Sequence, residues 1–255
     1  MTDHELVIDA QALTKIYPAQ IGQAAKTALD GLELRVARGE TFGILGPNGA
    51  GKTTTQKLFL GLMRPTKGTV TMFGARPDEA AVRKRIGFLP ENPYFYNYLT
   101  GEEFVRFCGG LFDIPRKTLE ERLDKLLELV GMQSAKEQQL RKYSKGMLQR
   151  IGIAQALIND PDLVLLDEPM SGLDPVGRHQ FREIIKGLKA QGKTIVFNSH
   201  ILSDVEDICD RFCILLHGRK VAEGTVAEFT SGGKSLEEHF VKVVNESNQG
   251  AAMIG

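Results

Sequence analysis

The segment GPNGAGKT at residues 46–53 constrains the fold of this 255-residue chain more than any other feature. It follows the apolar run TFGILG (41–46) and precedes TTTQKLFLGLM (53–63), which has the pattern of a helix. A glycine-rich turn between a strand and a helix lets successive backbone N–H groups point inward at phosphate oxygens. The segment therefore predicts a nucleoside-triphosphate site, in the kind of strand–turn–helix unit that builds a parallel sheet.

The residue types in this turn predict individual roles. Lys52 provides a positive charge for the β- and γ-phosphates, and Thr53 provides a hydroxyl ligand for Mg²⁺. A glycine-rich turn without a ligand is the alternative, but every fixed position and both flanking elements agree with the nucleotide site. The residues predicted to bind the nucleotide here are Gly46, Pro47, Asn48, Gly49, Ala50, Gly51, Lys52, Thr53 and Thr54.

Two acidic residues end a second apolar run, DLVLLDEP at 162–169. Asp167 would hold Mg²⁺, and Glu168, which points to the other side, would polarise the attacking water. His200 follows a further run, KTIVFNS, and so would lie at the carboxyl end of the sheet, where such folds bind ligands. Alone it would be read as an ordinary histidine, but next to the phosphate-binding turn it is predicted to contact the γ-phosphate. Strand-end acids are often only solvated charges, but next to the phosphate-binding turn we interpret Glu168, His200 and Lys52 as catalytic.

The remaining pattern alternates apolar runs with helices, and runs at 85–89 and 211–217 predict two more strands. Residues 98–158 break this alternation, because only helical patterns occur there. Thr100 with Glu103, and Thr118 with Glu121, predict capping boxes that open two of these helices. We expect a helical subdomain inserted into the α/β core, with one apolar helix face formed by Leu119, Leu123, Leu126 and Val130.

The C-terminal stretch predicts one more helix. Ser235 and Glu238 would cap it, with Leu236, Phe240 and Val243 on one side. The polar sequence that follows, ESNQGAAMIG, is expected to fray.

Composition narrows the functional classes. The chain has 32 basic and 32 acidic residues, and this balance argues against a nucleic-acid partner. No run approaches eighteen apolar residues, and MTDHELVIDA lacks a signal pattern, so we expect a chain that is neither membrane-spanning nor exported by itself. The three cysteines are expected to be ordinary thiols of a reducing cytoplasm rather than disulfides or metal ligands.

With these motifs in this order, residues 6–233 resemble an ABC-type ATP-binding cassette. YSKGM (143–147) stands at the family's signature loop, SGLDP (171–175) follows the catalytic glutamate, His200 matches the switch histidine, and Tyr17 matches the aromatic residue that stacks on adenine. The resemblance implies ATP and Mg²⁺ as ligands. It also implies a P-loop NTPase core at 6–90 and 160–233 with an N-terminal antiparallel β portion, a helical subdomain at 91–159, and a C-terminal helix and tail at 234–255.

The resemblance further implies a site built from two chains. Ser144 and Gly146 would contact ATP held by the P-loop of a second cassette, either identical or related. Asp174, in the SGLDP loop, is a further predicted nucleotide-binding residue. The signature departs from the common LSGGQ, because Tyr143, Lys145 and Met147 replace the Leu, the first of the two Gly and the Gln. Lys145 is either solvated or adds charge near the phosphates.

The segment LPENPYFYNY (89–98) carries a second departure, since Glu91 stands where the family commonly has glutamine. A carboxylate can also ligate Mg²⁺, so Glu91 is a predicted metal ligand with an altered charge. The aromatic residues that follow it, which are Tyr94, Phe95, Tyr96 and Tyr98, either pack on the helical subdomain or form a partner surface.

The resemblance therefore implies an ATP-hydrolysing ABC transporter subunit, peripheral on the cytoplasmic face of the membrane and docked on separate permease subunits. The chain looks most like cassettes of bacterial export systems in three places, which are SKGMLQR, Glu91 and SLEEHF. The alternative is a soluble ABC-type ATPase of a cofactor- or complex-assembly machine. A regulatory cassette that does not hydrolyse ATP would conflict with the presence of Glu168 and His200.

Overall fold

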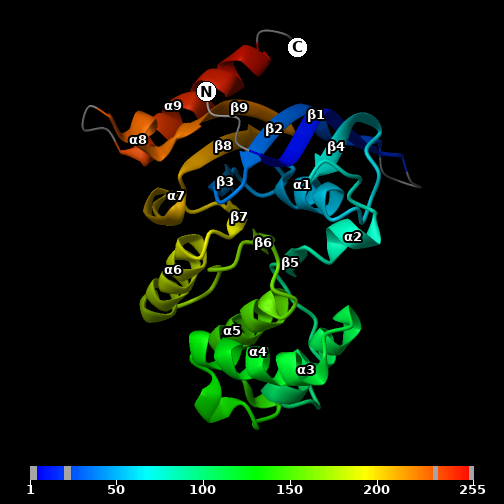
Figure 1. The fold of residues 1–255 in the computed structure, drawn as a ribbon. Coiled ribbons are helices and arrows are strands. Elements are labelled where there is room, and N and C mark those ends of the chain that lie inside the picture. Colours follow the sequence, from blue (N-terminus) through cyan, green and yellow to red (C-terminus); the bar gives the residue numbers. More distant parts are fainter. Residues whose placement is uncertain (1–4, 20–23, 232–234, 253–255) are drawn as a thin grey trace.

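The computed structural model describes residues 5–19, 24–231 and 235–252, and its strands form two sheets (Figure 1). The smaller sheet is antiparallel, in the order β2-β1-β4, and the larger has the order β5-β6-β7-β3-β8-β9. All pairs in the larger sheet are parallel except β8 with β9. This confirms the mostly parallel core and the N-terminal antiparallel portion. The strands are β1 (Leu6–Tyr17), β2 (Lys26–Ala37), β3 (Thr41–Leu45), β4 (Lys67–Met72), β5 (Ile86–Leu89), β6 (Leu163–Asp167), β7 (Thr194–Ser199), β8 (Arg211–Leu216) and β9 (Arg219–Thr225).

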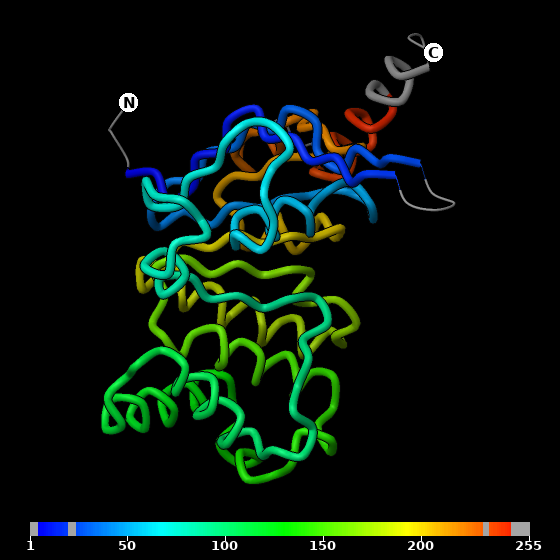
Figure 2. The backbone as a smooth tube through the Cα atoms, turned by 90° about the vertical axis from the view of Figure 1, so that its right-hand side faces the viewer, coloured from blue at the N-terminus to red at the C-terminus, as the bar shows by residue number. Residues whose placement is uncertain are grey.

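The helices divide between the core and one end of the molecule. Residues 98–158 contain helices and no strand, and they lie together at the end away from the antiparallel sheet (Figures 1 and 2). These are α3 (Gly101–Gly109), α4 (Arg116–Leu129) and α5 (Lys145–Leu157), with short 3₁₀ turns at Gly110–Phe112, Gln133–Ala135 and Leu140–Lys142. The other helices are α1 (Lys52–Phe59), α2 (Ala80–Arg83), α6 (Pro175–Ala190), α7 (Leu202–Ile208), α8 (Val226–Thr230) and α9 (Leu236–Ala252).

One of the two predicted capping boxes in this segment forms. The Thr100 hydroxyl accepts from the Glu103 N–H at 3.2 Å, and the Glu103 carboxylate accepts from the Thr100 N–H at 2.8 Å. The box at Thr118 is wrong, because α4 begins earlier, at Arg116. Pro115 lies before that helix with an extended ψ of 136°, and proline is well suited to a helix start.

Three of the four residues predicted for the apolar face of α4 are buried, namely Leu119, Leu123 and Val130, and the prediction fails only at Leu126. Leu119, Leu123 and Leu127 are buried along the helix, whereas Leu126 is only half-buried. These positions are four residues apart, which keeps them on one side of a helix with 3.6 residues per turn.

The parallel sheet separates two apolar cores. Along β6, Leu163 and Leu165 pack with the antiparallel sheet and α1, whereas Val164 and Leu166 pack with helices on the other face. This alternation follows from the two-residue period of a strand. Both faces of the central strands are therefore buried, which is why they appear in the sequence as continuous apolar runs.

The C-terminal helix begins as predicted and extends further. Ser235 and Glu238 exchange capping hydrogen bonds of 3.3 and 3.2 Å. Helix α9 then continues to Ala252, through most of the polar stretch that was expected to fray. Cys209 and Cys213 are buried free thiols, as expected, and in the described ranges no helix has the length and apolar character needed to span a membrane.

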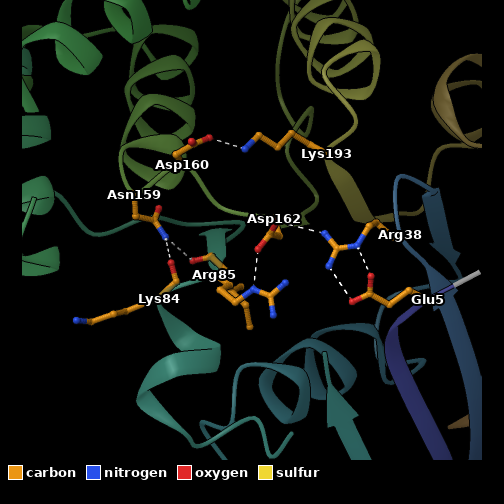
Figure 3. A network of polar contacts seen from close by, with 9 residues as sticks. Glu5, Arg38, Lys84, Arg85, Asn159, Asp160, Asp162 and Lys193 are labelled. Carbon is orange, nitrogen blue, oxygen red and sulfur yellow. Dashed lines mark hydrogen bonds and ion pairs between the residues drawn. The ribbon is translucent and has the colours of Figure 1, made fainter. Parts of the chain in front are cut away.

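Ion pairs link the two sheets at the edge where β5 and β6 begin (Figure 3). The Asp162 carboxylate pairs with Arg85 at 2.6 Å and with Arg38 at 3.3 Å, and Arg38 also pairs with Glu5 at 2.9 Å. Burial works to raise the pKa of Asp162, but the two arginines outweigh it and hold the pKa below its ordinary value. This network fixes the edge of the sheet opposite to the carboxyl ends of the strands.

Candidate functional site

The turn between β3 and α1 wraps around the ammonium group of Lys52. Lys52 is 6% exposed and donates to the Gly46 carbonyl at 2.6 Å. A Cβ at Gly46 would lie 2.3 Å from the Leu215 carbonyl oxygen, and one at Gly51, where φ is +112°, would lie 2.6 Å from that of Ala28. Both positions therefore need glycine, because the turn is pressed against neighbouring backbone.

Helix α1 begins at Lys52 without a side-chain cap. The N–H groups of its first turn have no partner within the helix and carry the positive end of the helix dipole. The turn and the helix start thus form the kind of backbone cradle that binds phosphate groups.

Glu168 connects Lys52 to His200. Its Oε1 lies 3.0 Å from Lys52 Nζ, and its Oε2 lies 2.7 Å from His200 Nδ1. Glu168 is 7% exposed and directly follows β6, while His200 follows the neighbouring strand β7. The parallel pairing of these strands brings both side chains to one edge of the sheet.

The backbone of Glu168 is strained. Its φ is +49°, a left-handed conformation that costs a residue other than glycine about 1–3 kcal/mol. The Glu168 N–H donates to the Asn198 carbonyl at 3.1 Å, which holds the chain in this conformation. Such strain is typical of positions where a side chain must point in one particular direction.

Asp167 is held by polar groups on both sides. Its Oδ2 accepts from the Thr53 hydroxyl at 3.0 Å, and its Oδ1 accepts from the Asn198 side-chain amide at 2.9 Å. The side-chain amide of Gln56 donates to the carbonyl of Leu166, one residue earlier, at 3.0 Å. Sequence reasoning missed Gln56 and Asn198. Asn198 is a polar residue that follows the apolar residues of β7, whereas Gln56 stands between Thr55 and Lys57 and gives no signal.

The donors around Asp167 suit Mg²⁺ bound together with phosphates. Mg²⁺ prefers oxygen ligands and commonly takes only one or two from protein groups. The Thr53 hydroxyl and the Asp167 carboxylate supply two oxygens side by side. No group of three or more His, Cys, Asp or Glu side chains in the described part of the chain could hold an ion alone.

A pocket of about 300 Å³ opens above these groups. The Tyr17 hydroxyl lies at its edge, 3.4 Å from the Thr54 hydroxyl. Four predicted site residues, Gly46, Ala50, Asp167 and His200, do not line the pocket themselves but contact residues that do. The lining consists of Tyr17, Lys26, Ala28, Pro47, Asn48, Gly49, Gly51, Lys52, Thr53, Thr54, Glu91 and Glu168.

The other three predicted nucleotide contacts lie elsewhere. Ser144 and Asp174 are the N-caps of α5 and α6, where they accept from the N–H groups of Met147 at 3.3 Å and Gly177 at 2.6 Å. Together with Gly146 they line a second hollow of about 600 Å³. The two hollows have no lining residue in common. Within one chain, therefore, the structure does not bring these residues to the P-loop.

The segment after Glu91 contains both buried and exposed aromatic residues. Phe95 is buried, and its ring lies 5.1 Å from that of Phe104 on α3. Tyr94, Tyr96, Tyr98 and Phe107 are exposed, and the ring of Tyr96 lies within 6.4 Å of the other three. We refer to these four residues as the tyrosine surface.

Together, the phosphate cradle, its buried lysine and the acids at the strand ends define a P-loop nucleotide-binding protein. A model of the ABC transporter family matches residues 29–171. The chain belongs to this family, whose ATP-binding cassettes bind ATP.

Curated relatives are similar over most of the chain. An uncharacterized ABC transporter ATP-binding protein of Nostoc sp. is 53% identical over 225 residues, which cover 87% of this chain and 67% of that protein. A fluoroquinolones export ATP-binding protein of Mycobacterium tuberculosis is 43% identical over 218 residues, which cover 85% of this chain and 70% of the relative. The chain thus spans about two thirds of the length of such relatives.

Solved structures show the same fold. The ATP-binding subunit of an ABC transporter superposes with a TM-score of 0.83 at 33% identity, covering 93% of this chain and 99% of the other. A dimeric ATP-binding cassette in a post-hydrolysis state, bound to ADP and Pi, has a TM-score of 0.78 at 25% identity and covers 86% of this chain and 98% of the other.

Proposed function

We propose that this chain hydrolyses Mg-ATP and that hydrolysis energises transport, in the direction of export, through separate membrane permease subunits. The observation that carries the hydrolytic part is the contact chain from Lys52 through Glu168 to His200. It places a carboxylate between the cation of the phosphate cradle and a histidine at the carboxyl end of the sheet.

Each side chain has a definite task in this proposal. Lys52 turns from Glu168 to the β- and γ-phosphates, which frees Glu168 Oε1 to accept a proton from the attacking water. His200 donates from Nδ1 to Glu168 Oε2, because a carboxylate can only accept, and it keeps the carboxylate oriented. Mg²⁺ held by Thr53 and Asp167, and reached by Glu91, would neutralise phosphate charge. Tyr17 stacks on the adenine ring.

A second cassette completes the site. Ser144 and Gly146 begin helix α5, so their partial positive charge suits the γ-phosphate of ATP bound to a partner chain. Asp174 belongs to the same hollow. The separation of this hollow from the P-loop pocket supports such a two-chain arrangement, as does the dimeric cassette of the same fold. ATP binding closes the dimer and hydrolysis reopens it.

The tyrosine surface is the proposed docking face for the permease. Tyr94 is 89% exposed and Tyr98 is 68% exposed, and exposed aromatic groups of this kind are enriched in the cores of protein interfaces. Similarity to a protein named for fluoroquinolone export supports the export direction. The chain would then reside peripherally on the cytoplasmic face of the membrane, without a nucleic-acid partner.

Purification from native membranes tests the proposal. The tagged chain should copurify with integral membrane proteins, and Tyr94→Ala with Tyr98→Ala should weaken this association without lowering basal ATPase activity. Leu62→Ala is a matched control, because Leu62 is 65% exposed but does not belong to the tyrosine surface. Recovery of the native protein only in the soluble fraction, bound to soluble assembly proteins, would favour the cofactor-assembly alternative instead.

A further inference from the structure

Two buried amides flank Asp167, and neither has a role in the proposed chemistry so far. Asn198 is 0% exposed and Gln56 is 1% exposed. Asn198 stands directly beside Asp167 in the parallel pairing of β7 with β6. Gln56 lies on α1, three residues after Thr53, and contacts the backbone just before Asp167. The two amides thus hold the carboxylate and its backbone separately.

These amides are costly to bury. The Asn198 Oδ1 and the Gln56 Oε1 have no hydrogen-bond partner in the structure. A buried polar atom without a partner lowers stability, because its hydrogen bonds to water are lost and not replaced. The donors of the two amides, by contrast, are both used on the Asp167 segment.

The hydrogen bond from Asn198 determines which oxygen of the Asp167 carboxylate faces Thr53. The Asn198 amide occupies Oδ1, so that Oδ2 turns toward the Thr53 hydroxyl at 3.0 Å. Without this donor, the Asp167 carboxylate could rotate about its terminal bond, a torsion with only a broad preference. The Gln56 contact limits a second movement, which is the shift of the strand end relative to α1.

We propose that Asn198 and Gln56 are positioning residues that orient Asp167 toward Thr53 for binding Mg²⁺. This inference rests on the proposed function, in which Asp167 and Thr53 hold the ion. Neither amide lines the pocket at the P-loop. Groups that hydrogen-bond to a metal ligand typically change metal affinity by about 10–100-fold when they are removed.

Binding of Mn²⁺ to the full-length protein in the presence of ADP tests the proposal, with electron paramagnetic resonance as the readout. Mn²⁺ accepts the same oxygen ligands as Mg²⁺, and the measurement does not depend on turnover. Asn198→Leu removes the amide while keeping the number and branching of the side-chain heavy atoms, and should weaken Mn²⁺ binding by about 10–100-fold. Asn198→Ser keeps a hydrogen-bond donor and should retain much of the affinity. Gln56→Met should also weaken Mn²⁺ binding, but by a smaller factor than Asn198→Leu.

Thr41→Val is the matched control. Thr41 is also 0% exposed, its hydroxyl also lacks a partner, and it begins β3 at the end away from the P-loop. This variant should leave Mn²⁺ binding unchanged. If Asn198 and Gln56 only stabilised the fold, their variants would unfold at a lower temperature but bind Mn²⁺ as tightly as Thr41→Val does. That result would overturn the inference.

Asp167→Asn separates this inference from the function on which it rests. The expected result is that each of the two single variants, Asp167→Asn and Asn198→Leu, binds Mn²⁺ more weakly than the wild type. Loss of Mn²⁺ affinity in Asp167→Asn alone would overturn only the positioning role. Unchanged affinity in Asp167→Asn would overturn the metal assignment itself.

Discussion

Replacing Glu168 with glutamine should stop the chemistry and preserve ATP binding. The new side chain has nearly the same size and one oxygen, so it can accept from Lys52 or from His200 but not from both. It cannot take a proton from water, and loss of a general base slows a reaction by about 10²–10⁴-fold. At 1.36 kcal/mol for each tenfold change, this corresponds to about 3–5 kcal/mol of barrier height.

The assay is a single turnover with enzyme in excess over ATP, with nucleotide affinity measured separately by a fluorescent ATP analogue. Affinity should change little, because Thr53 and Asp167 keep their contacts. Glu91→Gln is a matched control, since it makes the same substitution at another acid that lines the pocket. An undiminished single-turnover rate in Glu168→Gln would refute the assignment of this carboxylate as the base.

Three further predictions follow from the site and the opposite edge of the sheet. Lys52→Ala should abolish ATPase activity, and a calorimetric titration should show nucleotide binding weakened by about 2–3 kcal/mol, because a charge-assisted contact is lost. Near-normal turnover would overturn the role of Lys52 at the phosphates. Glu91→Gln should keep substantial ATPase activity whereas Glu91→Ala should lose much of it, and equal steady-state rates for wild type and the alanine variant would make Glu91 a bystander. Asp162→Asn should lower the free energy of unfolding by about 1 kcal/mol at neutral pH, because two partly exposed ion pairs are lost. Because the folded-state pKa of Asp162 is depressed, this difference is fully present above the ordinary carboxyl pKa of about 3.9 and disappears as the pH falls through the folded-state value. A gap in urea midpoints that persists in strong acid would contradict this explanation.

The parallel strands and the phosphate turn were predictable because their signals are local. Strands buried on both faces appear as continuous apolar runs, as in β6 and β7, and the motif at 46–53 fixes residue types one by one. The Thr100 capping box is equally local. The same pattern at Thr118 was misleading, because Pro115 already starts the helix one turn earlier.

The contacts of Asn198 and Gln56 were not predictable from the sequence. Asn198 follows the apolar residues of β7, whereas Gln56 stands among polar residues at the start of α1. The partner lies 31 residues away for Asn198 and 110 residues away for Gln56. Only the strand register and the packing of α1 on β6 bring these partners together. The left-handed backbone at Glu168 likewise has no signal in the residue type, because glycine would be the usual choice there.

The proposed function requires two cassettes to close over ATP, with Ser144 of one chain facing the phosphates of the other. Sizing chromatography of Glu168→Gln with and without Mg-ATP tests it most directly, together with the same variant carrying Ser144→Arg. Circular dichroism would check that α5 tolerates the loss of its N-cap, which costs about 1 kcal/mol. We expect an ATP-dependent dimer for Glu168→Gln and a monomer for the double variant. Equal dimerisation of the double variant would contradict the proposal.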